Sequence, residues 1–425
     1  MILLMAIRSL KDDLLRSVFY WLTFVLTSMF MFLFFHLSYS DMVGVTFINS
    51  HNDLATFLTI IVIGICMIVI FFANDFYVKK KSKDLAVRLV CGGTFFQIVR
   101  YLLYQTCLLF FMAIPIGITV GYLLFPLINW VLFNYLNSQQ ILTVQLSAIF
   151  STILIIGCEI FWCVLLNLGY AFRHSIKSLL DNQKSTVKFS FPILFHIQLK
   201  TKRTISFLLF FCPIVLIFFN QTRPESFLPF CIVGCFGIYS SIRYILIPYM
   251  NHLMINRFIE NKMRMIYIGF LRSDIILMKN NIVLMLVSVV LVISLFASSV
   301  NNPMEIMLTN VSFIVINVLV SLSVMFRFST EIVGRKKIFT SIERIGYMEK
   351  DQKRIILREV IGLYCFLMGV SLFYIAPILM IVSLQKVIPM IMIIELSLGF
   401  FIPMIICAIF NIFYYRKFIM KGVNV

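Results

Sequence analysis

Two carboxylates inside long apolar runs have the clearest chemical potential in this sequence. Glu159 lies between ILIIGC and IFWCVLL, and Glu395 lies between MIMII and LSLGFF. An ionisable side chain in hydrocarbon costs at least about 2.5 to 3.5 kcal/mol, so such residues are functional candidates by default. They could bind a proton or cation in an ion-coupled carrier, or they could join helices as protonated or hydrogen-bonded carboxyls. We favour the second interpretation, because no basic residue of clear depth accompanies them.

Other reactive side chains form no recognisable constellation. The ten cysteines show no CxxC spacing and the five histidines are dispersed, so we predict neither a disulfide scaffold nor a metal site. Sequence order suggests no Ser-His-Asp or Cys-His arrangement, and no GxxxxGK[ST] phosphate loop occurs. We therefore expect no catalytic residue, no enzyme activity and no cofactor bound by this chain.

The composition predicts a membrane environment. Of 425 residues, 61% are hydrophobic and 13% are charged, which argues against a water-soluble enzyme. A helix needs about 20 apolar residues to cross a hydrocarbon core of ~30 Å, where backbone groups must bond internally. The predicted fold class is an all-α polytopic membrane protein with about ten transmembrane helices. The predicted spans, of which the fifth is the shortest, are 18–38, 54–77, 101–124, 147–170, 204–220, 228–248, 281–299, 311–329, 360–383 and 389–413.

The basic residues predict the orientation of these spans, because Lys and Arg stay on the cytoplasmic side. If both termini are cytoplasmic, only Arg223 and Lys386 fall in exterior segments. The net charge of +18 is thus a topology signal, and we do not expect nucleic-acid binding. Before the first span, AIRSLKDDLLRS predicts an amphipathic surface helix with four residues towards lipid, namely Ile7, Leu10, Leu14 and Leu15; the alternative is a frayed basic tail.

The sequence repeats itself at about half its length. KKKSKDLAVRLVCGGTFFQIVRYLLYQTCLLF follows the second span, and GRKKIFTSIERIGYMEKDQKRIILREVIGLYCFL follows the eighth. A one-residue slip around Cys91 aligns the preceding helix better, so single pairs there stay open. A shift of 254 pairs Lys83 with Lys337, Leu85 with Phe339, Gly92 with Gly346, Arg100 with Arg354 and Gln105 with Glu359.

The repeat defines the expected domains. Residues 1–178 form a first four-helix repeat, 179–264 a linking segment with two spans and an interfacial helix, and 265–425 a second repeat. We expect an interfacial helix over 251–280. The two linking spans restore the starting side of the membrane, so the repeats run parallel, unlike the inverted repeats of many carriers.

Each repeat carries a basic cytoplasmic segment, 79–99 or 335–354, in which a short amphipathic helix is followed by a glycine. Such a helix can lie under the membrane and be pushed as a lever, with the glycine allowing a sharp turn into the next span. A single such helix would more simply be a basic anchor, but two equivalent copies favour the lever.

These segments resemble the FtsX-like permease domain of MacB-type ABC transporters. The basic run, LAVRLVCGGTFFQIV and the long span that follows are similar to the family pattern, and SIERIG with the later LRE is similar to the second domain of bacitracin-export-type permeases. Those permeases have two FtsX-like domains of four spans joined by two linking spans. They also have a large extracellular domain between spans seven and eight, where this sequence has only about residues 300–310.

The resemblance implies a membrane subunit that depends on two copies of a separate ABC ATPase, which would bind ATP and Mg. The two segments would receive the ATPase motion and transmit it to the spans, in the bacterial cytoplasmic membrane. The substrate class implied is an antimicrobial peptide or a similar amphipathic or lipid-linked molecule. The residues expected to couple to the ATPase are Lys83, Leu85, Arg88, Leu89, Gly92, Lys337, Phe339, Ile342, Glu343, Arg344 and Gly346.

Two other functions remain open at the level of sequence. The same motion could regulate a partner, such as a membrane histidine kinase or a cell-wall hydrolase, without moving cargo. An ion-coupled secondary carrier using Glu159 and Glu395 would need no ATPase. A neighbouring gene product with nucleotide-binding motifs would favour the ABC transporter subunit or the regulatory function over the ion-coupled carrier.

Overall fold

A computed structural model describes residues 2–12, 14–39, 53–136, 144–173, 199–219, 227–257, 262–298, 303–384 and 390–420. These residues are almost entirely helical and contain no strand, so the all-α prediction is confirmed. Within this part of the chain, nine helices are long and apolar enough to cross a membrane. The chain is therefore a multi-pass membrane protein.

The helices fall into two compact units. The first contains α1 (Ile2–Asp12), α2 (Leu14–Ser38), α3 (Asp53–Lys80), α4 (Ser82–Val90), α5 (Phe95–Leu123), α6 (Phe125–Leu136), α7 (Leu146–Arg173) and α13 up to Leu319. The second contains α9 (Leu199–Phe219), α10 (Phe227–Ser241), the π-helix η3 (Ile242–Leu246), α11 (Ile247–Asn256), α12 (Lys262–Ser298), the rest of α13 (Pro303–Arg344), α14 (Glu349–Leu384) and α15 (Met390–Met420).

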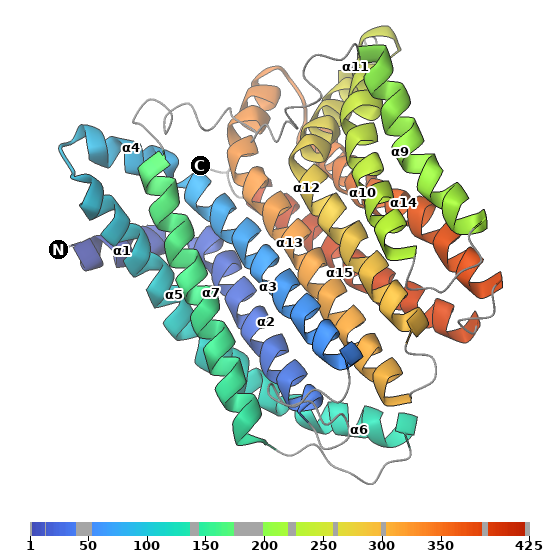
Figure 1. The fold of residues 1–425 in the computed structure, drawn as a ribbon. Coiled ribbons are helices and arrows are strands. Elements are labelled where there is room, and N and C mark those ends of the chain that lie inside the picture. The colour runs from blue at the N-terminus through green and yellow to red at the C-terminus, as the bar shows by residue number, and fades with distance from the viewer. Residues whose placement is uncertain are drawn as a thin grey trace. The chain divides into compact units, whose positions relative to one another are not determined.

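In the first unit, α2, α3, α5 and α7 run alongside one another (Figure 1). Helices α2 and α5 approach closely because Gly117 lies against Ser28, where an added Cβ would overlap the hydroxyl. Small residues at such positions let helix backbones pack tightly in membranes. Phe32 of α2 and Phe125 of α6 belong to one buried apolar cluster, which continues this contact to the C-terminal ends of α2 and α5.

In the second unit, α9 and α10 pack with comparable closeness. A Cβ on Gly237 would lie 2.6 Å from the backbone of Leu209 and Phe210. Helix α14 is tied to α10 by the Tyr374 hydroxyl, which donates a hydrogen bond of 2.6 Å to the Cys231 carbonyl. The fifth predicted span, 204–220, thus forms a helix, α9, although it is not among the nine that are long and apolar enough.

Several expectations about connections need correction. The interfacial helix expected over 251–280 is divided, because α11 ends at Asn256 while 262–280 belong to α12 and continue into the seventh span. Residues 125–136, expected as part of an exterior loop, form α6. The connection between α12 and α13 is indeed short, since only 299–302 separate them. The domain boundaries at 178 and 264 remain predictions, as does the cytoplasmic placement of both termini.

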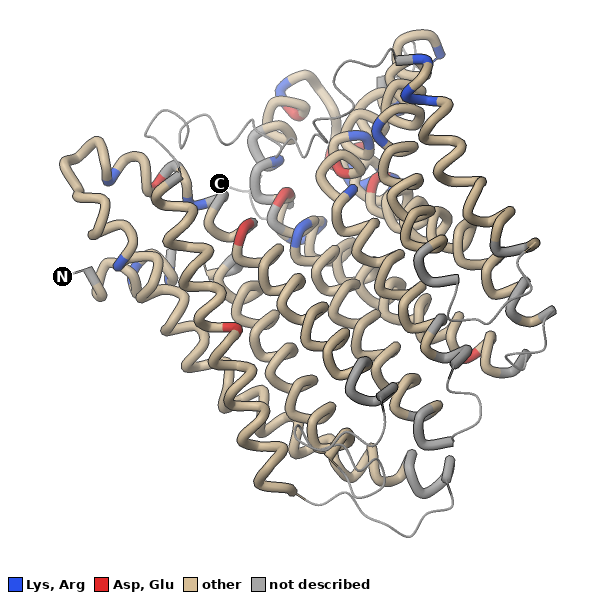
Figure 2. The backbone as a smooth tube through the Cα atoms, in the orientation of Figure 1, with Lys and Arg blue, Asp and Glu red and all other residues tan. Residues whose placement is uncertain are grey.

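The basic residues gather towards one end of the helices in each unit. Figure 2 shows Lys and Arg near α4 in the first unit and near the turn between α13 and α14 in the second. The apolar middle of each unit is almost free of such residues in the described part of the chain. This distribution is the one that the charge asymmetry of the sequence predicts.

Candidate coupling segments

The first segment leaves the membrane at Lys81, where a turn separates α3 from α4. The Lys81 N–H donates to the Val78 carbonyl at 3.1 Å, and α4 then begins at Ser82. Leu85 and Ala86 face the first unit, and Val87 and Val90 face outward with more than half of their surface exposed. The segment is therefore a short amphipathic helix, as its spacing predicts.

A left-handed glycine ends α4. Gly92 has φ +89°, its N–H donates to the Leu89 carbonyl at 3.1 Å, and the Gly93 N–H donates to the Arg88 carbonyl at 3.0 Å. This pair of bonds is a Schellman motif, which favours glycine because a side chain is strained at positive φ. Thr94 then starts α5, with its N–H donating to the Gln97 side-chain oxygen at 3.1 Å.

The second segment ends in the same way. Gly346 has φ +102°, its N–H donates to the Glu343 carbonyl at 2.8 Å, and the Tyr347 N–H donates to the Ile342 carbonyl at 3.4 Å. Each of these bonds is displaced by 254 residues from its counterpart in the first segment. The alignment left open around Cys91 is thus decided in favour of pairing Gly92 with Gly346.

The two copies differ before the turn. Lys81 interrupts the helix in the first copy, whereas α13 continues without a break from its predicted span to Arg344. Acidic Glu349 and Asp351 then occupy the first turn of α14, where negative charge complements the helix dipole. The second segment is therefore a direct extension of a transmembrane helix.

Three of the expected apolar contact residues face inward. Leu85 is 1% exposed, and Phe339 and Ile342 are also buried. Phe339 stacks on Phe270 with ring centroids 5.7 Å apart and meets the Tyr415 ring edge-on. These residues anchor the segments to their units, so the apolar surface open to a partner comes from their neighbours. It includes Val87, Val90, Phe96, Ile338, Ile345 and Met348.

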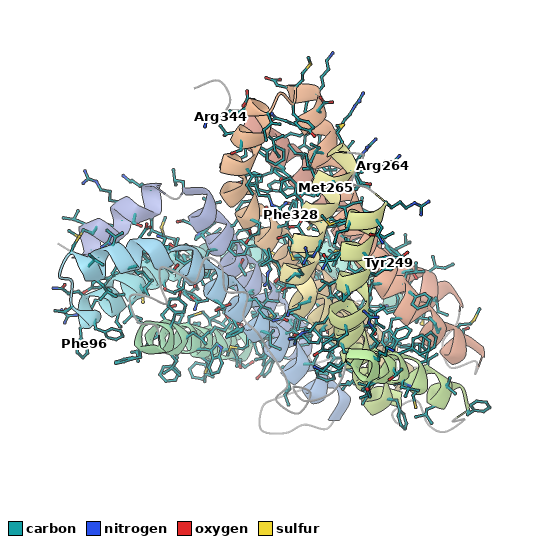
Figure 3. The ribbon with its side chains drawn as sticks, turned by 90° about the horizontal axis from the view of Figure 1, so that it is seen from above. Phe96, Tyr249, Arg264, Met265, Phe328 and Arg344 are labelled. Atoms are coloured by element: carbon teal, nitrogen blue, oxygen red, sulfur yellow. The ribbon has the colours of Figure 1, made fainter. Side chains whose placement is uncertain are left out.

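Some of the residues expected to make polar contacts with the ATPase are exposed, and others pack against their own unit. Glu343 and Arg344 are exposed, and Figure 3 shows Arg344 at the outer end of α13. Arg88 instead lies over the Tyr101 ring, 3.9 Å from its centroid, and Leu89 is half-buried beside it. The side chains of Lys83 and Lys337 lie outside the described residues.

A buried cation, Lys81, lies at the start of the first segment, immediately before α4. The Lys81 ammonium donates to the Ser9 hydroxyl of α1 at 3.0 Å and to the Gln105 side-chain oxygen of α5 at 3.2 Å. It lies 4.9 Å from the centroid of the Tyr77 ring. The Gln105 amide in turn donates to the Ala6 carbonyl at 3.4 Å. One side chain thus joins α1, the end of α3 and the start of α5.

An equivalent cation stands in the second segment. Arg335, buried on α13, forms ion pairs with Asp274 of α12 and Glu359 of α14. The Tyr415 hydroxyl donates to the second oxygen of Glu359 at 3.3 Å. Burial lowers the pKa of the Arg335 guanidinium, but Asp274, Tyr415 and Glu331 together outweigh it and raise this pKa above its usual value.

The family comparison falls on the first of these segments. The family described as FtsX-like permease C-terminal matches residues 56–167, which include α4, its glycine turn and Lys81. The bacitracin export permease protein BceB of Bacillus subtilis (strain 168) is 26% identical over 132 residues, 30% of this chain. That match spans 20% of the relative's length.

The FtsX-like resemblance is confirmed. The first unit carries the matched FtsX-like region, and the second unit repeats the glycine turn and the buried cation of that region. The short connection between the seventh and eighth spans that the sequence predicts is confirmed, because only the four residues 299–302 separate α12 from α13 and they are too few for an extracellular domain.

Sequence reasoning missed Lys81 and Arg335, although the signal was present. The shift of 254 that pairs Gln105 with Glu359 also pairs these two residues. Each stands in a run of basic residues, and composition does not distinguish a buried cation from its solvated neighbours. Only the packing of the two units does so.

The two carboxylates in the apolar runs have different surroundings. Glu159 on α7 is buried, and one of its side-chain oxygens has no hydrogen-bond partner among the described residues. Cys66 of α3 and Cys163 of α7 are within electrostatic reach of it. Glu395 on α15 is exposed on the outer surface of its unit. A shared ion-binding role for the two carboxylates therefore finds no support in their surroundings.

Proposed function

We propose that this chain is the membrane subunit of an ATP-binding cassette transporter in the bacterial cytoplasmic membrane. The observation that carries the proposal is the repeated segment: an amphipathic helix, a left-handed glycine and a long span, in two copies with matching hydrogen bonds. A helix held in this way can be displaced as a rigid lever, and its displacement reaches the span through the glycine turn. The FtsX-like match of the first copy supports the assignment.

Each segment would receive one copy of a separate ATPase, which binds ATP and Mg. Val90 and Ile345 are 67% and 76% exposed, and Glu343 and Arg344 lie beside Ile345. An apolar centre with a charged rim is a common composition for a protein interface. Motion is transmitted only if the two states of the ATPase contact these helices differently.

The substrate class is an antimicrobial peptide or a similar amphipathic molecule. The relative's name, bacitracin export permease, supports this class. The short connection between α12 and α13 leaves little room for an external recognition domain there, so the substrate would meet the helices themselves. Long apolar side chains on outward helix surfaces, such as Phe161 and Phe413, provide apolar surface of this kind.

The test is the native mass of the detergent-purified chain after co-expression with its ATPase. We expect one permease with two ATPase copies. Ile345→Glu should remove one ATPase copy. Leu146→Glu should keep both copies, because Leu146 is 86% exposed and begins α7, at the end of that helix away from the basic residues.

If the unmodified chain binds no ATPase, the proposal fails and an ion-coupled carrier becomes the hypothesis to test through Glu159. If ATPase binds but no peptide is moved, while a membrane kinase responds to ATP turnover, the signalling function replaces the transport function. In both cases the result for the unmodified chain would be compared with that for the Leu146→Glu variant.

A further inference from the structure

The two buried cations described above occupy one place in the repeat. Lys81 and Arg335 are 254 residues apart, the same shift that relates the two glycine turns. Each contacts the helix that opens its repeat, α1 or α12, through Ser9 or Asp274. Each also contacts the span that follows the turn, α5 or α14, through Gln105 or Glu359. The position of the contacts is retained although the partner changes from an amide to a carboxylate.

Because the two cations are buried, breaking their contacts costs more free energy than it would in water. Moving a cation out of water is expensive unless its donors are satisfied, so a buried ammonium or guanidinium resists losing its partners. Helix elements linked through such a group therefore move together more readily than they separate. In both repeats the linked elements are the root of the coupling segment, the opening helix and the next span.

The glycine turn alone would not provide this link. Gly92 and Gly346 have no neighbouring atoms within 4 Å of where a Cβ would lie, so the turns themselves are loosely surrounded. A displacement of α4 could be absorbed by rotation at such a turn. The Lys81 ammonium provides a second connection beside the turn, because it joins the start of α4 directly to Gln105 in the first half of α5.

We infer that Lys81 and Arg335 are positioning residues that transmit movement of each coupling segment to the opening helix and the following span. The inference rests on the proposed function, since it names the residues through which the ATPase motion would enter the two units. It assigns no contact with the ATPase or the substrate to either residue.

The test compares hydrogen exchange of the permease–ATPase complex without nucleotide and with ATP and vanadate. In the parent we expect exchange to change over residues 95–105 at the start of α5. Lys81→Met should reduce that change by at least about threefold while both ATPase copies stay bound, a size typical of residues that carry coupling between sites. Arg100→Met and Arg354→Met, exposed cations at equivalent places of the two repeats, should leave it intact.

Double variants that exchange the Lys81–Gln105 pair and the Arg335–Glu359 pair test whether a different polar pair can restore the coupling. Lys81→Arg with Gln105→Glu installs the second pair in the first repeat, and Arg335→Lys with Glu359→Gln does the reverse. Both double variants should retain the nucleotide-dependent change. Arg335→Met is a poorer choice, because it leaves two buried carboxylates without their cation and threatens folding.

The outcomes separate the inference from the proposed function. A Lys81→Met complex with the full nucleotide-dependent change at 95–105 overturns the inference and leaves the transporter intact. If the parent binds no ATPase, the proposed function fails. Hydrogen exchange of the permease alone then still tests whether Lys81 holds α1 and α5 together. Lys81→Met should then raise exchange in both α1 and the start of α5, and a rise confined to α4 would overturn the inference.

Discussion

At the scale of single residues, the glycines that end the coupling helices have the most constrained backbone. Valine at Gly346 must adopt φ near +102°, which costs about 1 to 2 kcal/mol, although space is available for its side chain. We expect Gly346→Val to insert into the membrane but to lose ATP-dependent activity by about tenfold or more, because the turn shifts and the helix no longer passes its motion to α14. The measurement is peptide-dependent ATP turnover of the purified complex.

Two control variants make this prediction specific. Gly346→Asn should retain most of the activity, because asparagine tolerates the left-handed region better than other side chains. Gly369→Val on α14 should be neutral, since Gly369 has neither a positive φ nor atoms near an added Cβ. Equal activity of Gly346→Val and the parent would remove the turn from the mechanism.

Glu159 allows a second prediction at this scale. If its buried carboxyl joins helices in its neutral form, the isosteric Glu159→Gln should change the free energy of unfolding by less than about 1 kcal/mol and keep peptide resistance. Glu159→Lys should prevent stable folding, because it places an ammonium where the surroundings are apolar. Thermal unfolding in detergent and a growth assay with peptide would measure both effects.

A carrier that uses Glu159 as an ion site would give the opposite result. Glu159→Gln would then fold normally and abolish resistance. Glu395→Gln is the matched control, because Glu395 lies in an equally apolar run but is exposed on its unit.

Sequence reasoning identified the glycines but not the cations, and the reason is physical. A glycine that ends an amphipathic helix has a local cause, its own positive φ, which the sequence pattern expresses. The burial of Lys81 depends on Ser9 and Gln105, which are distant in sequence. Leu85 and Phe339 show the same limit, because periodicity predicted an apolar face without saying which surface it covers.

At the scale of elements, the weakest predicted span provides the third prediction. Helix α9 packs so closely on α10 that a side chain at Gly237 would meet the backbone of Leu209 and Phe210. Gly237→Leu should therefore destabilise the second unit by about 1 to 3 kcal/mol, as overpacking usually does. Thermal unfolding of the purified chain would measure the loss.

Gly157→Leu on α7 is the control for this change, since nothing lies within 4 Å of its Cβ position. If both variants unfolded at the parent's temperature, α9 would not depend on α10 for its place. The basic first turn of α9, with Lys200, Lys202 and Arg203, would then suit a helix at the membrane surface.

The ends of elements were harder to predict than their existence. The apolar runs located a part of every described long helix, but α12 begins well before the predicted 281–299, and α13 extends at both ends beyond 311–329. Hydropathy marks the part of a helix that lies in lipid, whereas backbone hydrogen bonding continues into polar residues. Helix α6 was missed because FPLINWVLFNYL is apolar but too short to span a membrane, so only its packing through Phe125 reveals it.

At the scale of the whole molecule, the sequence predicted the parallel repeat because both units use the same local devices. The glycine turn, the buried cation and the long following span recur at one shift. With the two linking spans between the repeats, we predict that both coupling segments lie on the same side of the membrane. The basic residues that accumulate near these segments predict that this side is the cytoplasm.

A native thiol tests this orientation. Cys91 is exposed beside the first glycine turn, so with Cys158, Cys212 and Cys365 replaced by alanine it becomes the reporter for that end of α4. A membrane-impermeant maleimide should label it in inside-out vesicles and at least about tenfold less in intact cells, because a charged reagent does not cross hydrocarbon. Leu146→Cys, in a chain that also lacks Cys91, should show the reverse, since the 27-residue span that begins at Leu146 separates it from the basic end of α7. Labelling of Cys91 from outside would place both coupling segments beyond the reach of a cytoplasmic ATPase, and the lever mechanism would fail even if the helices fold as described.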